Sequence, residues 1–410
     1  MNKKLLFILC LLIFVDAIGA GLIFPIMPEL FFNTQYGLVK EDSFLSGNML
    51  YGLSFGLFPL ASFFGMPLLG SLSDQYGRKK IMILGLVGIC ISDLLSCLAI
   101  LVRDPYIFLL SRLVMGFCSG TYVIANAVIA DLSCGIKSKM NNFRWPILAF
   151  ISGFVLGPII GSSSTILVGL LSLTIPFAIA LCLSFFNLIF MYISFNEIYS
   201  TNQKERKVFK ELFKAINYIF INKSLNLLTI SYSLFQFSIG LFIQSISLFL
   251  AYTFSYNISD IGIFFSVMCI GLALNVLVIQ PLLSKYMKIS KLVITSISII
   301  AIMLIIQGVS VYIDAFISIN VKPVIWISSL VLHIFMPFAT TGYTSIYSEC
   351  IGKKEQGKAM GGLGQIYSMM WFLSSFFIGY LALTYESIIL ISAGMSALLA
   401  AFLLYVQFLK

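Results

Sequence analysis

Two aspartates interrupt long apolar stretches of the sequence, and a carboxyl group in such surroundings can carry a proton. Asp16 lies in LLFILCLLIFVDAIGAGLIFPIM and Asp93 lies in IMILGLVGICISDLLSCLAILV. In helices, both would lie about 16–18 Å into the apolar stretch, near the middle of a bilayer. An ionised aspartate there costs about 2.5–3.5 kcal/mol, and protonating an ordinary aspartate at pH 7 costs about 4 kcal/mol. Because these costs are similar, small changes in solvation can add or remove the proton. A permanently paired structural acid is the alternative for each residue.

One arginine also falls inside an apolar stretch. Arg112 lies about 9 Å into residues 106–131, where it needs a partner or a water-filled cavity. A structural ion pair and a role in proton relay or cavity charge both remain open for it. We expect its helical face to line a central cavity, together with residues at i+4, i+7, i+11 and i+14: Gly116, Ser119, Val123 and Asn126.

Other polar side chains in apolar stretches are expensive in lipid unless they face protein or water. Each is a candidate for lining a substrate cavity, and hydrogen bonding between helices is the alternative. Two aromatic residues, Tyr122 and Trp371, are candidates for stacking on a solute. The remaining candidates are Asn126, Gln236, Gln244, Asn275, Gln307, His333 and Gln365.

The stretch GSLSDQYGRKK, residues 70–80, places four charges between two apolar segments. Gly77 suits a tight reversal of the chain, and Gly70 suits close contact with a neighbouring helix. The basic residues alone would act as a topological anchor, but Asp74 adds nothing to such an anchor. The stretch therefore predicts a turn with a further role.

Three glycines recur at intervals of four in residues 143–164. Gly153, Gly157 and Gly161 would lie on one face of a helix, which allows another helix to approach closely. Pro158 loosens the backbone beside them. Tight packing alone and a flexible helix contact both fit this pattern.

Composition indicates the elements that position these residues. Of the 410 residues, 60% are hydrophobic and 10% are charged, with a mean hydropathy of +1.03, whereas a soluble domain is about a quarter charged. Apolar runs near the length of a membrane helix recur along the chain, so we predict an all-α membrane protein. The twelve predicted membrane segments are 5–32, 45–73, 81–102, 106–131, 143–164, 172–195, 223–254, 259–284, 290–313, 323–348, 357–384 and 386–408.

The placement of the basic residues predicts topology. Lys40, Arg103 and Lys322 fall in alternate loops and Arg112 in a helix, and the rest of the 25 Lys and Arg occupy the other loops and the two ends. This asymmetry places both termini in the cytoplasm. The net charge of +9 is thus a topology signal and a match to anionic membrane lipid, and it indicates no nucleic acid.

The longest polar interval divides the chain into an N-terminal bundle at 1–195, a cytoplasmic linker at 196–222 and a C-terminal bundle at 223–410. The halves echo each other weakly: PLLGSLSDQYGRKK follows the second segment, and PLLSKYMKISK follows the eighth. Two six-helix bundles with a substrate path between them are typical of transporters.

The sequence contains few residues or motifs that could carry out catalysis. It contains one histidine and eight scattered cysteines, with no Cys/His cluster, no GxSxG and no phosphate-binding loop. We therefore expect no enzyme activity, no cofactor and no metal site.

Five patterns together resemble a known family. GSLSDQYGRKK is similar to the G-x-L-x-D-x-x-G-R-[KR] signature of the major facilitator superfamily, and KKEQGKAMGG is similar to its E-x-Q-G pattern before helix 11. Helix 4 carries R-x-x-x-G-x-x-x-G from Arg112 to Gly120. Helix 1 carries D-x-x-G-x-G-x-x-x-P-x-x-P from Asp16 to Pro28, and helix 5 carries G-x-x-x-G-P-x-x-G from Gly153 to Gly161. The last two resemble the 12-helix proton-coupled drug antiporters, the tetracycline exporters in particular.

This resemblance implies the major facilitator fold and roles for the residues that match. Asp16 and Asp93 match acids of the tetracycline exporters, and the helix 5 glycines would form a contact that obstructs proton leak. Asp74 would pair with Arg78 and face the start of helix 11 near Gly357, which latches the cytoplasmic side.

The resemblance breaks in the C-terminal half. Where the tetracycline exporters carry an acid in helix 9 and a histidine in helix 8, this sequence has Ile299 and Gly271. Proton coupling would then be concentrated in the N-terminal half, and a metal–tetracycline substrate is disfavoured.

The sequence thus predicts a secondary active transporter of the inner (plasma) membrane. It would move a small organic solute by alternating access, as a monomer, through proton-coupled efflux with Asp16, Asp93 and Arg112 carrying the coupling. Proton-coupled uptake or export of a metabolite, such as a siderophore or an amino acid, is the alternative. A sensor on the same fold that does not transport is a further one.

Overall fold

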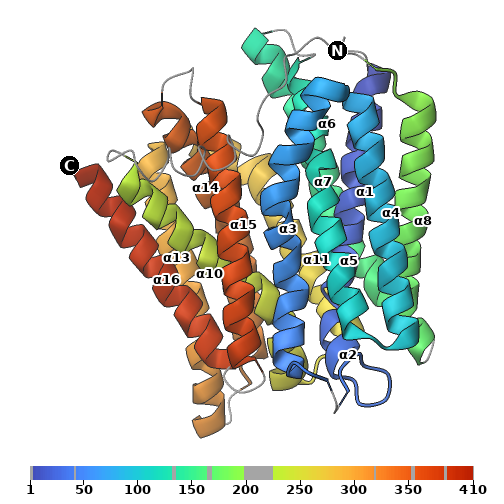
Figure 1. Ribbon diagram of the computed structural model, residues 1–410. Coiled ribbons are helices and arrows are strands. Elements are labelled where there is room, and N and C mark those ends of the chain that lie inside the picture. Colours follow the sequence, from blue (N-terminus) through green and yellow to red (C-terminus); the bar gives the residue numbers. More distant parts are fainter. Residues whose placement is uncertain are drawn as a thin grey trace. The chain divides into compact units, whose positions relative to one another are not determined.

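A computed structural model describes residues 3–40, 43–131, 135–163, 169–197, 225–317, 320–351, 356–382 and 386–409. The described elements are helical throughout (Figure 1). Up to residue 197 the helices are α1 Lys3–Ile23, α2 Met27–Phe32, α3 Gly47–Tyr76, α4 Arg78–Val102, α5 Pro105–Cys118, α6 Gly120–Asp131, α7 Gly135–Ser163 and α8 Leu170–Ser194. From residue 225 they are α10 Asn226–Phe254, α11 Ile258–Leu274, the π-helical η2 Asn275–Ile279, α12 Gln280–Leu283, α13 Ile289–Ile317, α14 Lys322–Cys350, α15 Gln356–Leu381 and α16 Glu386–Leu409.

The chain forms two compact units. The first comprises Met1–Lys210 with Asn257–Ser266, and the second comprises Glu211–Tyr256 with Val267–Lys410. Most of the predicted linker at 196–222 lies outside the described residues, and the division into bundles at 1–195 and 223–410 remains a prediction.

Eleven helical segments of the described residues are long and apolar enough to cross a membrane, counting α5 with α6 as one and α11 to α12 as one. At 1.5 Å per residue, the 25-residue helix α4 is about 37 Å long, which exceeds the hydrocarbon thickness. The twelfth predicted segment, at 357–384, coincides with α15, a helix that is not among the eleven. The count of twelve and the cytoplasmic termini therefore remain predictions.

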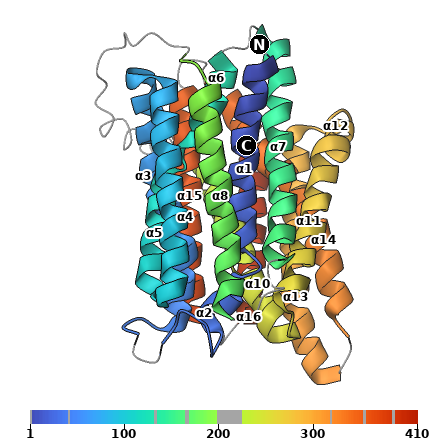
Figure 2. The ribbon, with the colours of Figure 1, turned by 90° about the vertical axis from the view of Figure 1, so that its right-hand side faces the viewer.

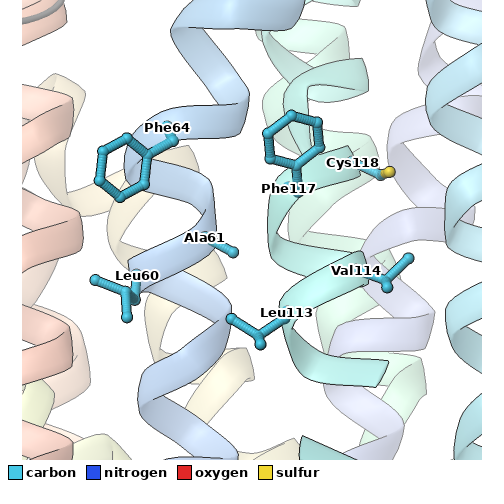
Figure 3. A pocket seen from close by; sticks show the side chains of 7 residues that line it. All are labelled: Leu60, Ala61, Phe64, Leu113, Val114, Phe117 and Cys118. Carbon is cyan, nitrogen blue, oxygen red and sulfur yellow. The ribbon is translucent and has the colours of Figure 1, made fainter. Parts of the chain in front are cut away.

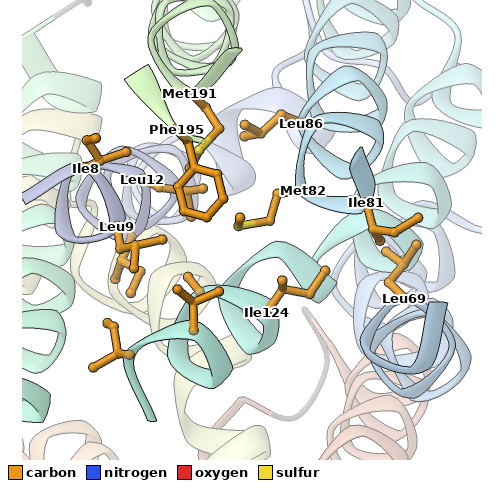
Figure 4. Close-up of a cluster of buried hydrophobic side chains, with 14 of the residues drawn as sticks. Ile8, Leu9, Leu12, Leu69, Ile81, Met82, Leu86, Ile124, Met191 and Phe195 are labelled. Carbon is orange, nitrogen blue, oxygen red and sulfur yellow. The ribbon is translucent and has the colours of Figure 1, made fainter. Parts of the chain in front are cut away.

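Helix contacts in the first unit join both consecutive elements and elements that are distant in sequence. The closest associations are α1 with α7, α3 with α5, and α4 with both α5 and α8, and Figure 2 shows α4 and α8 side by side. Buried apolar side chains from α1, α3, α4, α6 and α8 meet in one cluster (Figure 4). Leu12, Met82 and Phe195 are fully buried there, so the end of α8 is anchored in the core of this unit.

The second unit is organised around α10. This helix contacts α15 and α16, while α13 contacts α14 and α16. Within the membrane segment of α10, 83% of the residues are buried, more than in any of the other ten candidate segments. An all-round buried helix is expected to carry small and polar residues as well as apolar ones, and α10 contains Ser231, Ser238 and Gln244.

Three predicted segments are interrupted, and each break has a local cause. Pro25 and Pro28 lack an N–H, and the chain turns between α1 and α2. At Ser119, between α5 and α6, the hydroxyl donates to the Gly116 carbonyl at 2.7 Å and competes with the backbone. Pro281 cannot donate to the carbonyl four residues back, and the Gln280 N–H instead donates to the Asn275 carbonyl, which produces η2.

Candidate functional site

Asp16 lies in α1 beside the start of α6. The Thr121 hydroxyl donates to Asp16 Oδ2 at 3.3 Å. Asp16 is half-buried, and among the described residues no basic group lies within 4 Å of its carboxylate. The acid is therefore held by a neutral donor, so its charge is not fixed by an ion pair.

Asp93 lies deeper, between α4 and α8. Only 2% of its surface is exposed, and the Ser184 hydroxyl of α8 donates to Asp93 Oδ2 at 2.8 Å. The Cys90 thiol donates to the Ser184 oxygen at 3.5 Å, so a short polar chain ends at the carboxylate.

Arg112 of α5 is bound by hydroxyl groups. Its Nη2 donates to Ser96 Oγ at 2.9 Å and its Nε to Ser111 Oγ at 3.5 Å. The guanidinium also lies 4.9 Å from the centre of the Phe108 ring and 5.8 Å from that of Phe177.

The charge of Arg112 is not directly paired. Among the described residues, no carboxylate oxygen lies within 4 Å of its guanidinium, although it interacts with Asp93 at longer range. A direct structural ion pair, one of the two alternatives for Arg112, is thus absent from the described structure. Because a buried charge without compensation is costly, this longer-range attraction to Asp93 and the hydroxyls of Ser96 and Ser111 together stabilise the guanidinium.

The predicted cavity face runs along α5 and α6 and is interrupted at Ser119, where α5 ends. Gly116 contacts the backbone of α3, where an added Cβ would lie 2.1 Å from the Phe58 oxygen. Beyond the break, Val123 is 39% exposed, and the half-buried Asn126 donates to the Tyr122 carbonyl at 3.0 Å. Only this second part of the face reaches the surface of the unit, and cavity lining by Tyr122 and Asn126 remains a prediction.

The three glycines of the predicted segment 143–164, which lie in α7, form the expected close contact. An added Cβ would lie 2.4 Å from the Phe14 oxygen at Gly153, 2.7 Å from the Ile18 oxygen at Gly157 and 2.5 Å from the Leu22 oxygen at Gly161. The backbone of α1 therefore lies directly on α7, and Pro158 contacts Gly21 of α1. This contact fixes the helix that carries Asp16.

The charged turn at 70–80 joins α3 to α4. As predicted, Asp74 pairs with Arg78, with 2.6 Å between Oδ1 and Nη2, and Gly77 has a positive φ of 103°. The expectation for Gly70 is wrong in the described structure, because no atom lies within 4 Å of a Cβ added there. Gly357 lies in the first turn of α15, and its role remains a prediction.

Glu197 also belongs to this turn, although sequence reasoning missed it. Its carboxylate accepts the backbone N–H groups of Arg78 at 3.1 Å and Lys79 at 3.0 Å. The sequence gives no signal for the contact, because 119 residues separate Arg78 from Glu197.

Polar residues of the second unit form neutral contacts. Gln236 Oε1 accepts the indole N–H of Trp371 at 3.4 Å, and Gln244 Nε2 donates to the Trp371 carbonyl at 3.1 Å. The Tyr367 ring lies 4.9 Å from the Trp371 ring. Gln365 is buried in the same helix, α15, and its Oε1 has no donor among the described residues. Gln236 and Gln244 thus make interhelical hydrogen bonds, and cavity lining by either residue remains a prediction.

His333 lies in a second polar group, between α13 and α14. Gln307 Nε2 donates to Ser329 Oγ at 2.9 Å, and His333 Nδ1 lies 2.9 Å from the Ser329 carbonyl oxygen. A carbonyl only accepts, so Nδ1 carries a proton and donates it to this oxygen. Asn275, at the start of η2, donates to the carbonyl of the neighbouring Ile334. The side-chain oxygens of Gln307 and Asn275 are buried and have no donor among the described residues.

A groove of about 540 Å³ lies away from these polar groups. It runs between α3 and α5 (Figure 3), and apolar side chains line it: Leu60, Ala61, Phe64, Leu113, Val114, Phe117 and Cys118. None of the predicted site residues lies in this lining. The groove suits hydrocarbon, whereas a polar solute would find no hydrogen-bond partner in it.

The long apolar helices of both units, with two carboxyl groups inside the helices of the first, define a polytopic membrane protein of a known class. A model of the Major Facilitator Superfamily matches residues 9–361. The chain belongs to the Major Facilitator Superfamily, as its motifs predicted.

Curated relatives are drug-resistance proteins. The tetracycline resistance protein, class C, of Escherichia coli is 33% identical over 43% of this chain and 40% of its own length. The class H protein of Pasteurella multocida is 30% identical over 65% of this chain and 64% of its own length. The quinolone resistance protein NorA of Staphylococcus aureus is 28% identical over 64% of this chain and 62% of its own length. Each match therefore spans less than two thirds of the relative.

Solved structures share the fold. The D-xylose-proton symporter superimposes with a TM-score of 0.77 at 15% identity, covering 98% of this chain and 97% of that one. The human organic anion transporter MFSD10 (TETRAN) gives 0.71 at 18% identity, covering 98% and 99%. At these identities the likeness is one of fold.

Proposed function

We propose that this protein is a secondary active transporter of the inner (plasma) membrane, which exports a small organic solute in exchange for protons by alternating access. The observation that carries the proposal is the pair of carboxyl groups inside the membrane helices, Asp16 and Asp93. Each is held by a hydroxyl donor, and among the described residues neither forms a direct ion pair. Such a group can gain and lose a proton without breaking a salt bridge.

Export is the direction that the curated relatives support, because their names describe resistance to tetracycline and quinolone. For one proton exchanged with one neutral solute, 100 mV supplies about 2.3 kcal/mol, enough for a gradient of about 50-fold. The solute would bind among the predicted cavity residues, and Asp74, Arg78 and Gly357 would control the cytoplasmic side. The transporter would act as a monomer in lipid.

Uptake or export of a metabolite remains the second candidate. A D-xylose-proton symporter and a nucleoside transporter share the fold, with TM-scores of 0.77 and 0.75, and the fold therefore sets no direction. A strain that lacks the protein separates the two. Sensitivity to a compound supports export, and failure to grow on one nutrient supports uptake.

Transport into proteoliposomes under an imposed pH gradient tests proton coupling. A thermal-shift screen of small organic compounds first supplies a ligand. We expect the gradient to drive flux in the wild type and in Glu386→Gln, a matched control at the start of α16. Asp16→Asn and Asp93→Asn should bind the ligand but fail to couple. Gradient-independent flux in the wild type, or normal coupling in both variants, would exclude antiport through these acids.

A further inference from the structure

The first turn of α4 is capped by a residue from another helix. The first N–H groups of a helix lack acceptors within it, and the residue at the cap position, Gly77, has no side chain to supply one. Glu197 supplies both of its carboxylate oxygens instead, one to the Arg78 N–H and one to the Lys79 N–H. A carboxylate is favoured at this end because it also meets the positive end of the helix dipole.

Gly77 leaves the space that this carboxylate occupies. Its φ of 103° lies in a region that side-chain-bearing residues rarely adopt. A Cβ added at Gly77 would lie 2.6 Å from Glu197 Oε2 and 3.0 Å from its Cδ. Gly77 therefore permits the turn and also leaves room for the Glu197 carboxylate.

The segment before Glu197 is itself fixed. Phe195 is fully buried in the apolar cluster of the first unit, and its N–H donates to the Met191 carbonyl at 3.1 Å. The Lys79 ammonium lies 5.4 Å from the centre of the Tyr192 ring. Residues from the end of α8 thus contact the start of α4 at several points.

The turn is held from its other side as well. Arg78 pairs with Asp74 of α3 and donates from Nη1 to Ser73 Oγ at 2.7 Å. Arg78 therefore contacts α3 through its side chain, and through its backbone N–H it contacts Glu197, which lies beyond the end of α8. The ends of α3, α4 and α8 are joined through Arg78.

We propose that Glu197 is a positioning residue of the transport cycle, which locks the start of α4 to the end of α8 and thereby fixes the orientation of Asp74. The inference rests on the proposed function, in which Asp74 controls the cytoplasmic side. Glu197 touches no solute in this role. Its loss should slow the conformational step and leave solute binding unchanged.

Hydrogen–deuterium exchange tests the lock independently of transport. In Glu197→Ala we expect the amides of residues 78 and 79 to exchange about tenfold faster, since each loses a charged acceptor. Glu386→Ala serves as the control and should leave this exchange unchanged. Unchanged exchange at 78 and 79 in Glu197→Ala would overturn the lock even if transport were lost.

Transport kinetics test the positioning role. Glu197→Ala should lower the maximal rate about tenfold and leave the half-saturating solute concentration within about twofold, and Glu197→Gln should lie between it and the wild type. Faster exchange with a normal transport rate would overturn the positioning role. If the wild type transports nothing, the proposed function fails, while the exchange result still decides whether the lock exists.

A double variant separates the lock from a general loss of folding. Gly77→Ala alone forces its Cβ against the carboxylate, and we expect it to slow transport. Glu197→Ala removes the clashing atoms, so Gly77→Ala should cost less in that background than in the wild type. Strictly additive effects of the two substitutions would contradict a direct contact between these residues.

Discussion

The polar groups buried in the two units differ in charge. In the first unit, two carboxylates and a guanidinium lie inside the membrane helices, each held by serine or threonine hydroxyls: Asp16, Asp93 and Arg112. In the second unit, the buried polar groups in the described helices are amides, hydroxyls and one imidazole. Hydroxyls can donate to an ionised carboxylate or accept from a protonated one, so the first unit tolerates a change of charge. Among the described side chains, the groups that could exchange a proton in the proposed transport cycle therefore gather in the first unit.

This comparison depends first on the contact between α7 and α1, the helix that carries Asp16. Gly157→Leu should destabilise the protein by about 3 kcal/mol, because its side chain meets the α1 backbone, and thermal unfolding in detergent measures the loss. Gly364→Ala in α15, where no atom lies within 4 Å, should change stability by less than about 1 kcal/mol. Equal effects of the two substitutions would contradict the described α1–α7 contact.

Neutralising the acids should abolish coupling. In Asp16→Asn or Asp93→Asn, the solute gradient sustained by 100 mV should fall from about 50-fold to about 1, because no proton is exchanged. Solute accumulation in proteoliposomes measures this ratio. Accumulation at the wild-type level in both variants would remove the distinction between the units.

Removing the hydroxyl beside Asp93 should have a smaller effect. Ser184→Ala deletes a hydrogen bond to a charged acceptor, and we expect a rate loss of about tenfold with unchanged solute affinity. Ser172→Ala is the matched control, because the Ser172 hydroxyl donates locally to the carbonyl of Gly169, the residue that caps the start of α8. If the two variants transport equally, Ser184 plays no part in the exchange of the proton.

Substitution of His333 should have the smallest effect on transport, and it tests the second unit directly. His333→Gln keeps a polar side chain, and we expect the transport rate between pH 5.5 and 8 to stay within about twofold of the wild type with the same pH profile. A flattened profile in this variant would show that a titrating group of the second unit takes part in coupling.

Much of the fold follows from hydropathy, because a membrane helix must be apolar over its whole length. The described helices overlap the predicted segments, with the start of the segment 45–73 at Gly47 and the end of 81–102 at Val102. Three segments are interrupted, and α7 begins at Gly135, eight residues before the predicted start at 143. The break at Ser119 was not predicted, since it depends on a hydroxyl bond that any serine can form. The pair Asp74–Arg78 was predictable because the two residues are four apart.

The partners of the acids were harder to predict. Ser184 and Thr121 are residue types found throughout membrane helices, and nothing in the sequence indicates which serine faces Asp93. Asn187 was also missed, although it is buried and donates to the Leu12 carbonyl at 3.4 Å, one turn before Asp16. These contacts cross between helices that are distant in sequence, so periodicity within one helix contains no information about them.

The glycine contact between α1 and α7 has a consequence for variation in the chain. The outward side of α7 is permissive, because Leu156 and Ile159 are 40% and 44% exposed and can change among apolar types. Insertion or deletion is different, since one residue rotates everything beyond it by about 100°. A one-residue insertion between Gly153 and Gly157 would replace glycine with a bulkier neighbour at the α1 backbone. On this outward side the length of α7 is therefore more constrained than its composition. A library of random variants should retain apolar substitutions at Leu156 and Ile159 but lose one-residue insertions between Gly153 and Gly157.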